Sequence, residues 1–110
     1  MVRTKYEILI RDNFQCQCCG KVFPADKLQL AHRIMQARRS KLTLKYIQNY
    51  IKYQYNKDIT LKQAEYILHD EDNLVTTCSL ACNSHFNIWN NPVKRNKLVM
   101  KIYEKNRGKL

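Results

Sequence analysis

The chain has 110 residues, which suits one domain with a single hydrophobic core. It carries 20 Lys and Arg against 9 Asp and Glu, and the resulting formal net charge of +11 attracts polyanions to the surface. Nucleic acid is therefore the expected class of partner, although charge alone does not separate a protein that binds nucleic acid from one that cuts it.

The amino-terminal segment, residues 1–13, alternates charged and apolar side chains and lacks the uninterrupted apolar stretch of a signal peptide. No segment approaches the roughly 20 apolar residues that a membrane-spanning helix requires. We therefore expect a cytoplasmic protein with no membrane partner. In that compartment the five cysteines indicate metal ligands or free thiols in preference to disulfides.

The first predicted element is a short helix from Thr4 to about Arg11, because Thr4 and Glu7 have the spacing of a capping box. Residues 27–30 alternate polar and apolar side chains, which indicates a half-buried strand. His32 is expected at the end of that strand.

A helical hairpin is predicted over about residues 40–69. Its first helix is indicated by apolar side chains at helical spacing, namely Leu44, Ile47, Ile51 and Tyr55. Thr60 and Gln63 repeat the capping-box spacing, so a second helix is expected to begin there and to run to about His69.

Beyond the hairpin, residues 74–77 predict a second short strand and residues 82–88 a helix. The run Asn90-Asn91-Pro92 ends that helix, and a last helix is expected over about residues 93–107. Its lysines recur at helical spacing and form one basic stripe: Lys94, Lys97, Lys101 and Lys105. No repeat or flexible linker divides the chain, so residues 1–110 are predicted to form a single α+β domain.

Two short-spaced cysteine pairs stand far apart in the sequence, Cys16 with Cys19 and Cys78 with Cys82. The first pair is followed by Gly20, which permits the tight turn of a zinc knuckle, and both spacings fall within the range for thiolate pairs. We therefore predict a structural Zn²⁺ site of four cysteines, with Cys18 left as a free thiol beside it. An alternative site that uses Cys16 and Cys18 is less favoured, because C-x-C strains a single tetrahedral ion.

Two sequence blocks lie between the cysteine pairs, LAHRI at residues 30–34 and DEDNLVTTC at residues 70–78. Together with the lead-in RDNFQCQCCG at residues 11–20, they make residues 11–87 resemble the HNH endonuclease family. The resemblance implies a ββα-metal fold, in which two strands carrying His32 and Asn73 pack on a helix that begins near Cys82.

The resemblance also implies roles for three residues. His32 occupies the position of the general base that takes a proton from water, a role suited to an imidazole. Asn73 corresponds to the residue whose amide holds the catalytic loop through backbone hydrogen bonds. Asn83 stands where the family has its final His, and its amide oxygen is able to bind a hard catalytic cation, Mg²⁺ or Mn²⁺.

One departure concerns the catalytic cation. Ala31 stands where many members of the family place a metal ligand before the base, so Asn83 is expected to need a helper. The candidates are His69, His85 and Asn87. For His69 an equally weighted alternative is a cation that favours the carboxyl end of the preceding helix.

Contacts with DNA are expected from the basic stripe of the last helix and from a second group after the first strand, formed by Arg33, Arg38, Arg39 and Lys41. Double-stranded DNA with weak sequence preference is the expected substrate. The hairpin tyrosines are expected to pack the insertion onto the domain, with stacking on unpaired bases as the alternative. The rival hypothesis for the whole chain is a nonenzymatic zinc module that binds DNA or RNA.

Overall fold

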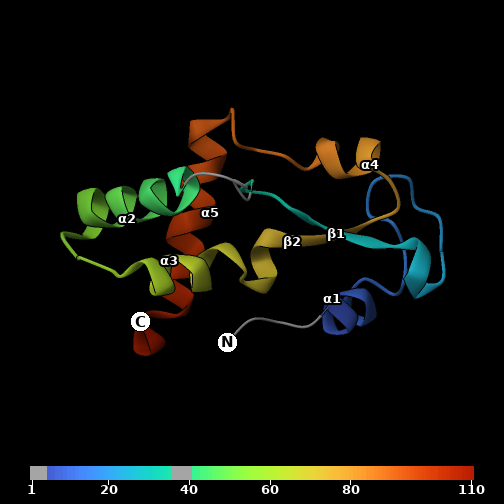
Figure 1. Ribbon diagram of the computed structural model, residues 1–110, viewed down its shortest axis with the longest axis horizontal. Coiled ribbons are helices and arrows are strands. Elements are labelled where there is room, and N and C mark those ends of the chain that lie inside the picture. The colour runs from blue at the N-terminus through green and yellow to red at the C-terminus, as the bar shows by residue number, and fades with distance from the viewer. Residues whose placement is uncertain (1–4, 36–40) are drawn as a thin grey trace.

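The computed structural model of the chain describes residues 5–35 and 41–110. Within them it has a two-stranded sheet and five α-helices, so the predicted mixed α+β class is confirmed (Figure 1). The elements are α1 (Lys5–Arg11), β1 (Gln29–His32), α2 (Leu42–Tyr55), α3 (Leu61–Leu68), β2 (Leu74–Thr77), α4 (Leu80–His85) and α5 (Pro92–Lys105), with short 3-10 turns at Ala25–Lys27, Glu71–Asn73 and Arg107–Lys109.

The molecule is elongated, with extents of 43 × 28 × 24 Å, and its two ends are built differently. At one end, the sheet end, the β1–β2 sheet runs between α4 and α1, and at the other, the helical end, α2, α3 and α5 pack together (Figure 1). The helix α3 leads through the Glu71–Asn73 turn directly into β2. This connection joins the helical end to the sheet end.

The two strands are antiparallel, with Gln29 opposite Thr77 and His32 opposite Leu74. The second strand occupies the predicted residues 74–77, whereas the first lies two residues beyond the predicted range of 27–30. The reason is local. The 3-10 turn Ala25–Lys27 occupies the start of the predicted strand, and pairing with β2 then fixes the register through to His32.

The helical hairpin is present as predicted, and the capping box between Thr60 and Gln63 forms with both of its hydrogen bonds. Its apolar faces meet α5 in the main core, whose buried members are Ile34, Ile47, Ile51, Ile59, Ala64, Ile67, Leu68, Leu98, Val99, Ile102 and Tyr103. Burial of these side chains is the principal source of stability at this end of the molecule.

The helix predicted over residues 82–88 is instead α4, Leu80–His85, which begins two residues earlier and ends sooner. Ser79 is its N-cap, and the Ser79 hydroxyl accepts a hydrogen bond from the backbone N–H of Cys82. A side-chain acceptor at that position satisfies one of the unpaired N–H groups of the first helical turn. Cys82 therefore lies inside the helix.

The other boundaries agree more closely. The last helix begins at Pro92, one residue before the predicted start, with Asn91 as its N-cap. Pro is well tolerated there because the first helical N–H groups have no partner within the helix. Thr4, half of the predicted capping box of α1, lies outside the described residues. Of the helices in residues 5–35 and 41–110, none is both long enough and apolar enough to cross a bilayer.

Candidate functional site

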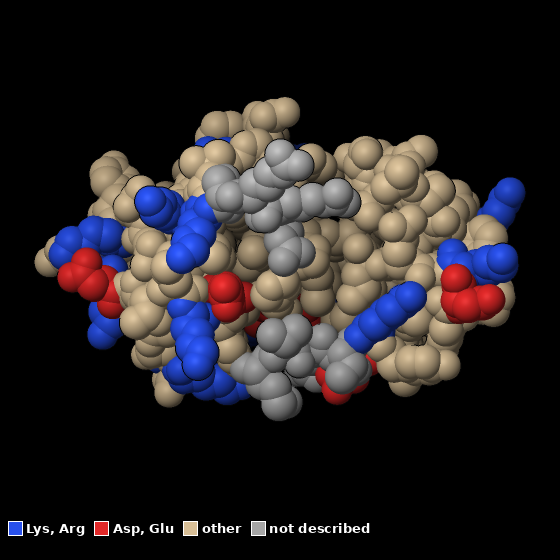
Figure 2. Space-filling model, in the orientation of Figure 1, with Lys and Arg blue, Asp and Glu red and all other residues tan. Residues whose placement is uncertain are grey.

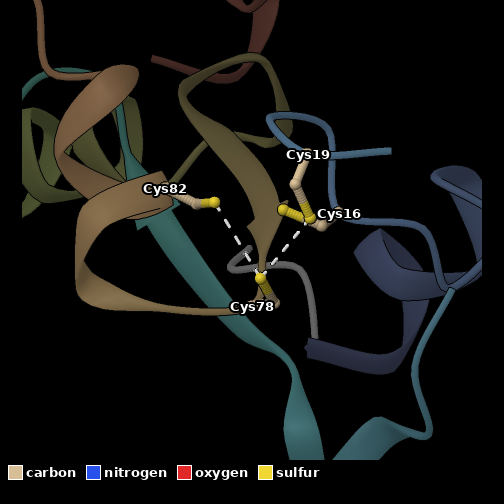
Figure 3. A group of neighbouring side chains, drawn as sticks. All are labelled: Cys16, Cys19, Cys78 and Cys82. Carbon is tan, nitrogen blue, oxygen red and sulfur yellow. Dashed lines mark hydrogen bonds between the residues drawn. The ribbon is translucent and has the colours of Figure 1, made fainter. Parts of the chain in front are cut away.

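The four predicted cysteine ligands meet at the sheet end of the molecule. Cys16 and Cys19 come from the loop after α1, Cys78 follows β2, and Cys82 lies in α4, and their sulfur atoms converge (Figure 3). All four Sγ atoms lie within 4.8 Å of one another.

The spacing of the sulfur atoms suits a tetrahedral ion. The Sγ atoms of Cys19 and Cys78 are 3.7 Å apart, and those of Cys78 and Cys82 are 3.9 Å apart. Four thiolates at the usual zinc–sulfur distance of about 2.3 Å lie about 3.8 Å from each other. The cluster can therefore hold a metal ion such as zinc without rearrangement of these two pairs.

A tight turn presents the first cysteine pair. The backbone N–H of Cys16 donates to Lys21, and that of Gly20 donates to the carbonyl of Cys16. Gly20 has φ of +80°, a conformation that L residues with a side chain rarely adopt. The N–H of Gln17 donates to the carbonyl of Thr76 in β2, which fixes the turn against the sheet.

The electrostatics of the cluster also favour a cation. Burial raises the pKa of Cys16, but hydrogen bonds from the backbone N–H groups of Cys19 and Cys18 outweigh that effect and lower it. Burial and the thiols of Cys19 and Cys16 raise the pKa of Cys78. One thiolate therefore forms readily while a second is opposed, and a bound cation removes that opposition.

Cys18 lies beside the cluster as an exposed free thiol, as predicted. Its interaction with the thiol of Cys82 is the main cause that raises its pKa. The structure groups Cys19, and not Cys18, with the other three sulfurs. The less favoured alternative with Cys16 and Cys18 is therefore not the arrangement adopted.

A pair of histidines lies where the β1–β2 sheet meets the helical end. The Nε2 atom of His32, the last residue of β1, is 3.1 Å from the Nδ1 atom of His69, which follows α3. The rings meet edge to face, with centroids 5.1 Å apart. Sequence spacing left the position of the His69 ring undetermined, and the fold brings it to His32 across 37 residues of chain.

The surroundings of the pair favour neutral rings. Burial, and secondarily His69, lower the pKa of His32 to about 4. Burial also lowers the pKa of His69, against the opposing effect of Glu65. At neutral pH both imidazoles are therefore uncharged, and the short contact is a hydrogen bond in which one ring donates and the other accepts.

Asn73 ties together the two backbone segments that carry these histidines. Its Oδ1 atom accepts from the N–H of Ile34 at 2.8 Å, and its Nδ2 atom donates to the carbonyl of Leu68 at 2.7 Å. Its own carbonyl accepts from the N–H of Arg33. The side chain is fully buried, and its hydrogen bonds to the backbone hold residues 33–34 against residue 68.

A charged network supports the turn that contains Asn73. Lys105 of α5 lies 2.7 Å from Asp70 and 2.9 Å from Asp72, and Asn106 donates to the other oxygen of Asp70. Lys105 was predicted to contact DNA as part of the basic stripe. Because its ammonium group is already engaged by these carboxylates, we expect phosphate contacts from the other three lysines of the stripe, which are exposed.

The remaining candidate ligands for a catalytic cation lie on or after α4. Asn83 is half-buried, the ring of His85 packs edge-on against Phe86, and the side chain of Asn87 accepts a hydrogen bond from the backbone N–H of Trp89. Among the described residues, His69 is the predicted helper that an interaction joins to His32.

Apart from the four-cysteine cluster, residues 5–35 and 41–110 contain no other group of three His, Cys, Asp or Glu ligand atoms close enough to share an ion. Ala31 supplies no donor, as the sequence indicated. The described residues therefore show the cysteine cluster as their one group of such ligands that could hold a metal ion.

Most of the described residues that were predicted to contact DNA lie at the helical end, and Arg33 lies just after β1. Arg33 is half-buried beside His32, and its Nε atom is buried with no hydrogen-bond partner among the described residues. Lys41, Lys94, Lys97 and Lys101 are exposed. Arg38 and Arg39 lie outside the described residues. On the face drawn in Figure 2, Lys and Arg side chains gather over the end formed by α2, α3 and α5.

Sequence reasoning missed a brace between α1 and β2. Arg11 donates to the carbonyls of Glu71 and Leu74, and Asp12 accepts from the backbone N–H of Thr76. Both residues belong to the block that resembles the HNH lead-in, but no spacing rule in one sequence connects them to a strand about 60 residues away.

Comparison of the chain with protein-family models, with curated proteins and with solved structures gave no significant match.

Proposed function

We propose that the chain is a metal-dependent endonuclease of the HNH type, which hydrolyses phosphodiester bonds in DNA with His32 as the general base. The observation that carries the proposal is the Asn73 clamp, which holds the segments bearing His32 and His69 together and leaves the two ring nitrogens 3.1 Å apart. A fixed, neutral imidazole is the group that proton abstraction from water requires.

The histidine pair defines which nitrogen of His32 would act. In the tautomer in which Nε2–H donates to His69, the Nδ1 atom of His32 carries the free lone pair. A pKa of about 4 makes this nitrogen a weak base, so the attacking water must itself be acidified. A divalent cation, Mg²⁺ or Mn²⁺, would supply that acidification when bound and would stabilise charge on the phosphate.

The remaining residues have supporting roles in this proposal. Zinc at Cys16, Cys19, Cys78 and Cys82 would fix α4, and with it Asn83, against the end of β2. Arg33, the half-buried residue that follows His32, would bring its positive charge close to the scissile phosphate.

The second candidate is a nonenzymatic zinc module that binds DNA or RNA. It is favoured by the scarcity of ligands for a second cation, since Ala31 has no donor and the cysteine cluster is the one multi-ligand group among the described residues. In this case His32, His69 and Asn73 serve to join the β1–β2 sheet to the helices, and binding proceeds without cleavage.

A plasmid assay separates the two candidates. Zinc-loaded protein is incubated with supercoiled DNA and Mg²⁺ or Mn²⁺, and a parallel sample receives excess chelator just before the DNA. The nuclease proposal expects nicked or linear product that requires the added cation, with intact zinc content. Retarded DNA on a native gel without cleavage under any divalent cation would favour the binding module.

The exposed lysines of α5 are expected to set the salt dependence of DNA binding. Each phosphate contact releases condensed counterions, so Lys97→Ala with Lys101→Ala should lower the slope of log affinity against log salt by about 1 per lysine. The matched control is Lys57→Ala with Lys62→Ala, which removes the same charge from exposed positions before and within α3. Equal losses in the two double variants would contradict a specific role for α5.

A further inference from the structure

A groove lies between α2 and α5 at the helical end of the molecule. Its volume is about 540 Å³, within the range of about 300 to 1,000 Å³ that is usual for small-molecule sites. Lys45, Tyr46, Asn49 and Tyr50 of α2 line it on one side, and Arg95 and Asn96 of α5 on the other. It combines aromatic rings, amides and cations, and none of these lining side chains is acidic.

Three tyrosines follow one another along α2 from the groove to the surface. The rings of Tyr46 and Tyr50 are nearly parallel, with centroids 6.3 Å apart, and Tyr53 lies 6.5 Å beyond Tyr50. Tyr53 is 83 % exposed. A row of aromatic rings that reaches solvent provides faces on which unpaired bases stack with little regard to sequence.

A guanidinium group forms the base of this aromatic row. Arg95 lies 4.5 Å from the ring centroid of Tyr46 and 4.7 Å from that of Trp89, and it donates to the carbonyl of Trp89. Its Nε atom is buried and has no hydrogen-bond partner among the described residues. The packing therefore holds a cation in the lining of the groove, which suits an anionic ligand.

The amides at the groove provide polar contacts for a base edge. The hydroxyl of Tyr46 donates to Oδ1 of Asn96 at 2.6 Å, which leaves the Nδ2 donors of Asn96 available to a ligand. Asn49 is exposed and carries both a donor and an acceptor. Amide side chains with this capacity pair with the edges of bases, and exposed Lys45 adds a cation for a phosphate.

Backbone contacts connect the groove to the histidine pair. The N–H of Ile88 donates to the carbonyl of Arg33, the residue after His32, at 2.9 Å. The next residue, Trp89, packs edge-on against Tyr46 and carries Arg95 on its ring. The segment that contacts the end of β1 therefore also packs against two of the residues that line the groove.

We propose that the groove between α2 and α5 binds an unpaired nucleotide of single-stranded DNA, with the base stacked on Tyr50 and the phosphate at Lys45 and Arg95. The inference rests on the proposed nucleic-acid function, since it names the form of substrate that the chain holds, but it requires binding and not cleavage. A groove that combines aromatic rings with two cations, and that has no acidic lining residue, fits the base and the phosphate of a nucleotide together.

The test measures the affinity for a fluorescein-labelled oligothymidylate in the zinc-loaded full chain. Tyr50→Ala is expected to weaken binding about 10-fold, because one stacked base contributes an effect of that order. Tyr50→Phe keeps the ring and should retain wild-type affinity. Tyr6→Ala is the matched control, because it removes an exposed tyrosine from α1, which contributes nothing to the groove lining.

Trp89 is the single tryptophan of the chain and provides a second readout. Its emission should change on binding of the oligonucleotide, and Lys45→Ala should shift that titration to higher concentration while leaving zinc content and melting temperature unchanged. Unchanged affinity in both Tyr50→Ala and Lys45→Ala would overturn the groove assignment, even if the plasmid is cleaved. Weakened affinity in a chain that cleaves nothing would support the groove and reject the nuclease.

Discussion

Cys19→Ser is expected to lose the bound zinc and, with it, the cooperative unfolding transition. The four cysteines join three separate segments, the loop after α1, the end of β2 and α4, and these contribute few residues to the main core. Structural zinc in small domains contributes about 10 to 16 kcal/mol of apparent binding free energy, as much as the whole stability of a typical domain. Removal of one thiolate is therefore expected to unfold at least the sheet end of the molecule.

The neighbouring residue supplies the matched control. Cys18→Ser changes the same atom one position away, outside the group of four, and should keep about one zinc per chain and the wild-type melting temperature. Elemental analysis and circular dichroism on both variants make the comparison. A Cys19→Ser protein that remains folded and melts like the wild type would remove the structural zinc from the account.

Asn73→Ala is expected to lower the free energy of unfolding by about 3 kcal/mol, because several hydrogen-bonding groups in a buried site lose their partner together. The Oδ1 and Nδ2 atoms serve the N–H of Ile34 and the carbonyls of Leu68 and Ile34, and no water reaches this fully buried side chain directly from the surface. For a chain of this size the melting temperature should fall by about 10 °C or more.

Denaturant and thermal unfolding measure this loss, with Asn90→Ala as the control because Asn90 is exposed. The clamp also predicts a local effect. In Asn73→Ala the ring resonances of His32 and His69 should move toward those of exposed histidines, since the segments that hold the two rings together are no longer tied. A melting temperature within about 2 °C of wild type would contradict the clamp.

Features set by local patterns were predictable from the sequence. The strand at residues 74–77, the capping box of Thr60 with Gln63 and the four-cysteine group each follow from short-range spacing and are present. The displacement of β1 arose because a 3-10 turn competed with the strand pattern, and pairing with β2 decided the register. A single sequence does not display that competition.

Contacts made by the tertiary fold were not predictable. His69 meets His32 where Asn73 joins the end of α3 to the residues after β1, and helical or strand periodicity does not predict such a junction. Lys105 lies on the same helical stripe as three exposed lysines, yet its ammonium group forms ion pairs with Asp70 and Asp72. The groove likewise requires α2 and α5 to pack side by side, across about 50 residues of chain.

The proposed nuclease activity depends on His32, which would remove a proton from the attacking water. The most direct test is the single-turnover rate of plasmid nicking with Mn²⁺ by the wild-type protein and by His32→Ala, at equal zinc content and with DNA affinity measured in parallel. We expect the rate to fall about 10³-fold, which is within the usual range for loss of a general base, while affinity and melting temperature stay nearly unchanged. A His32→Ala protein that nicks DNA at the wild-type rate would contradict it.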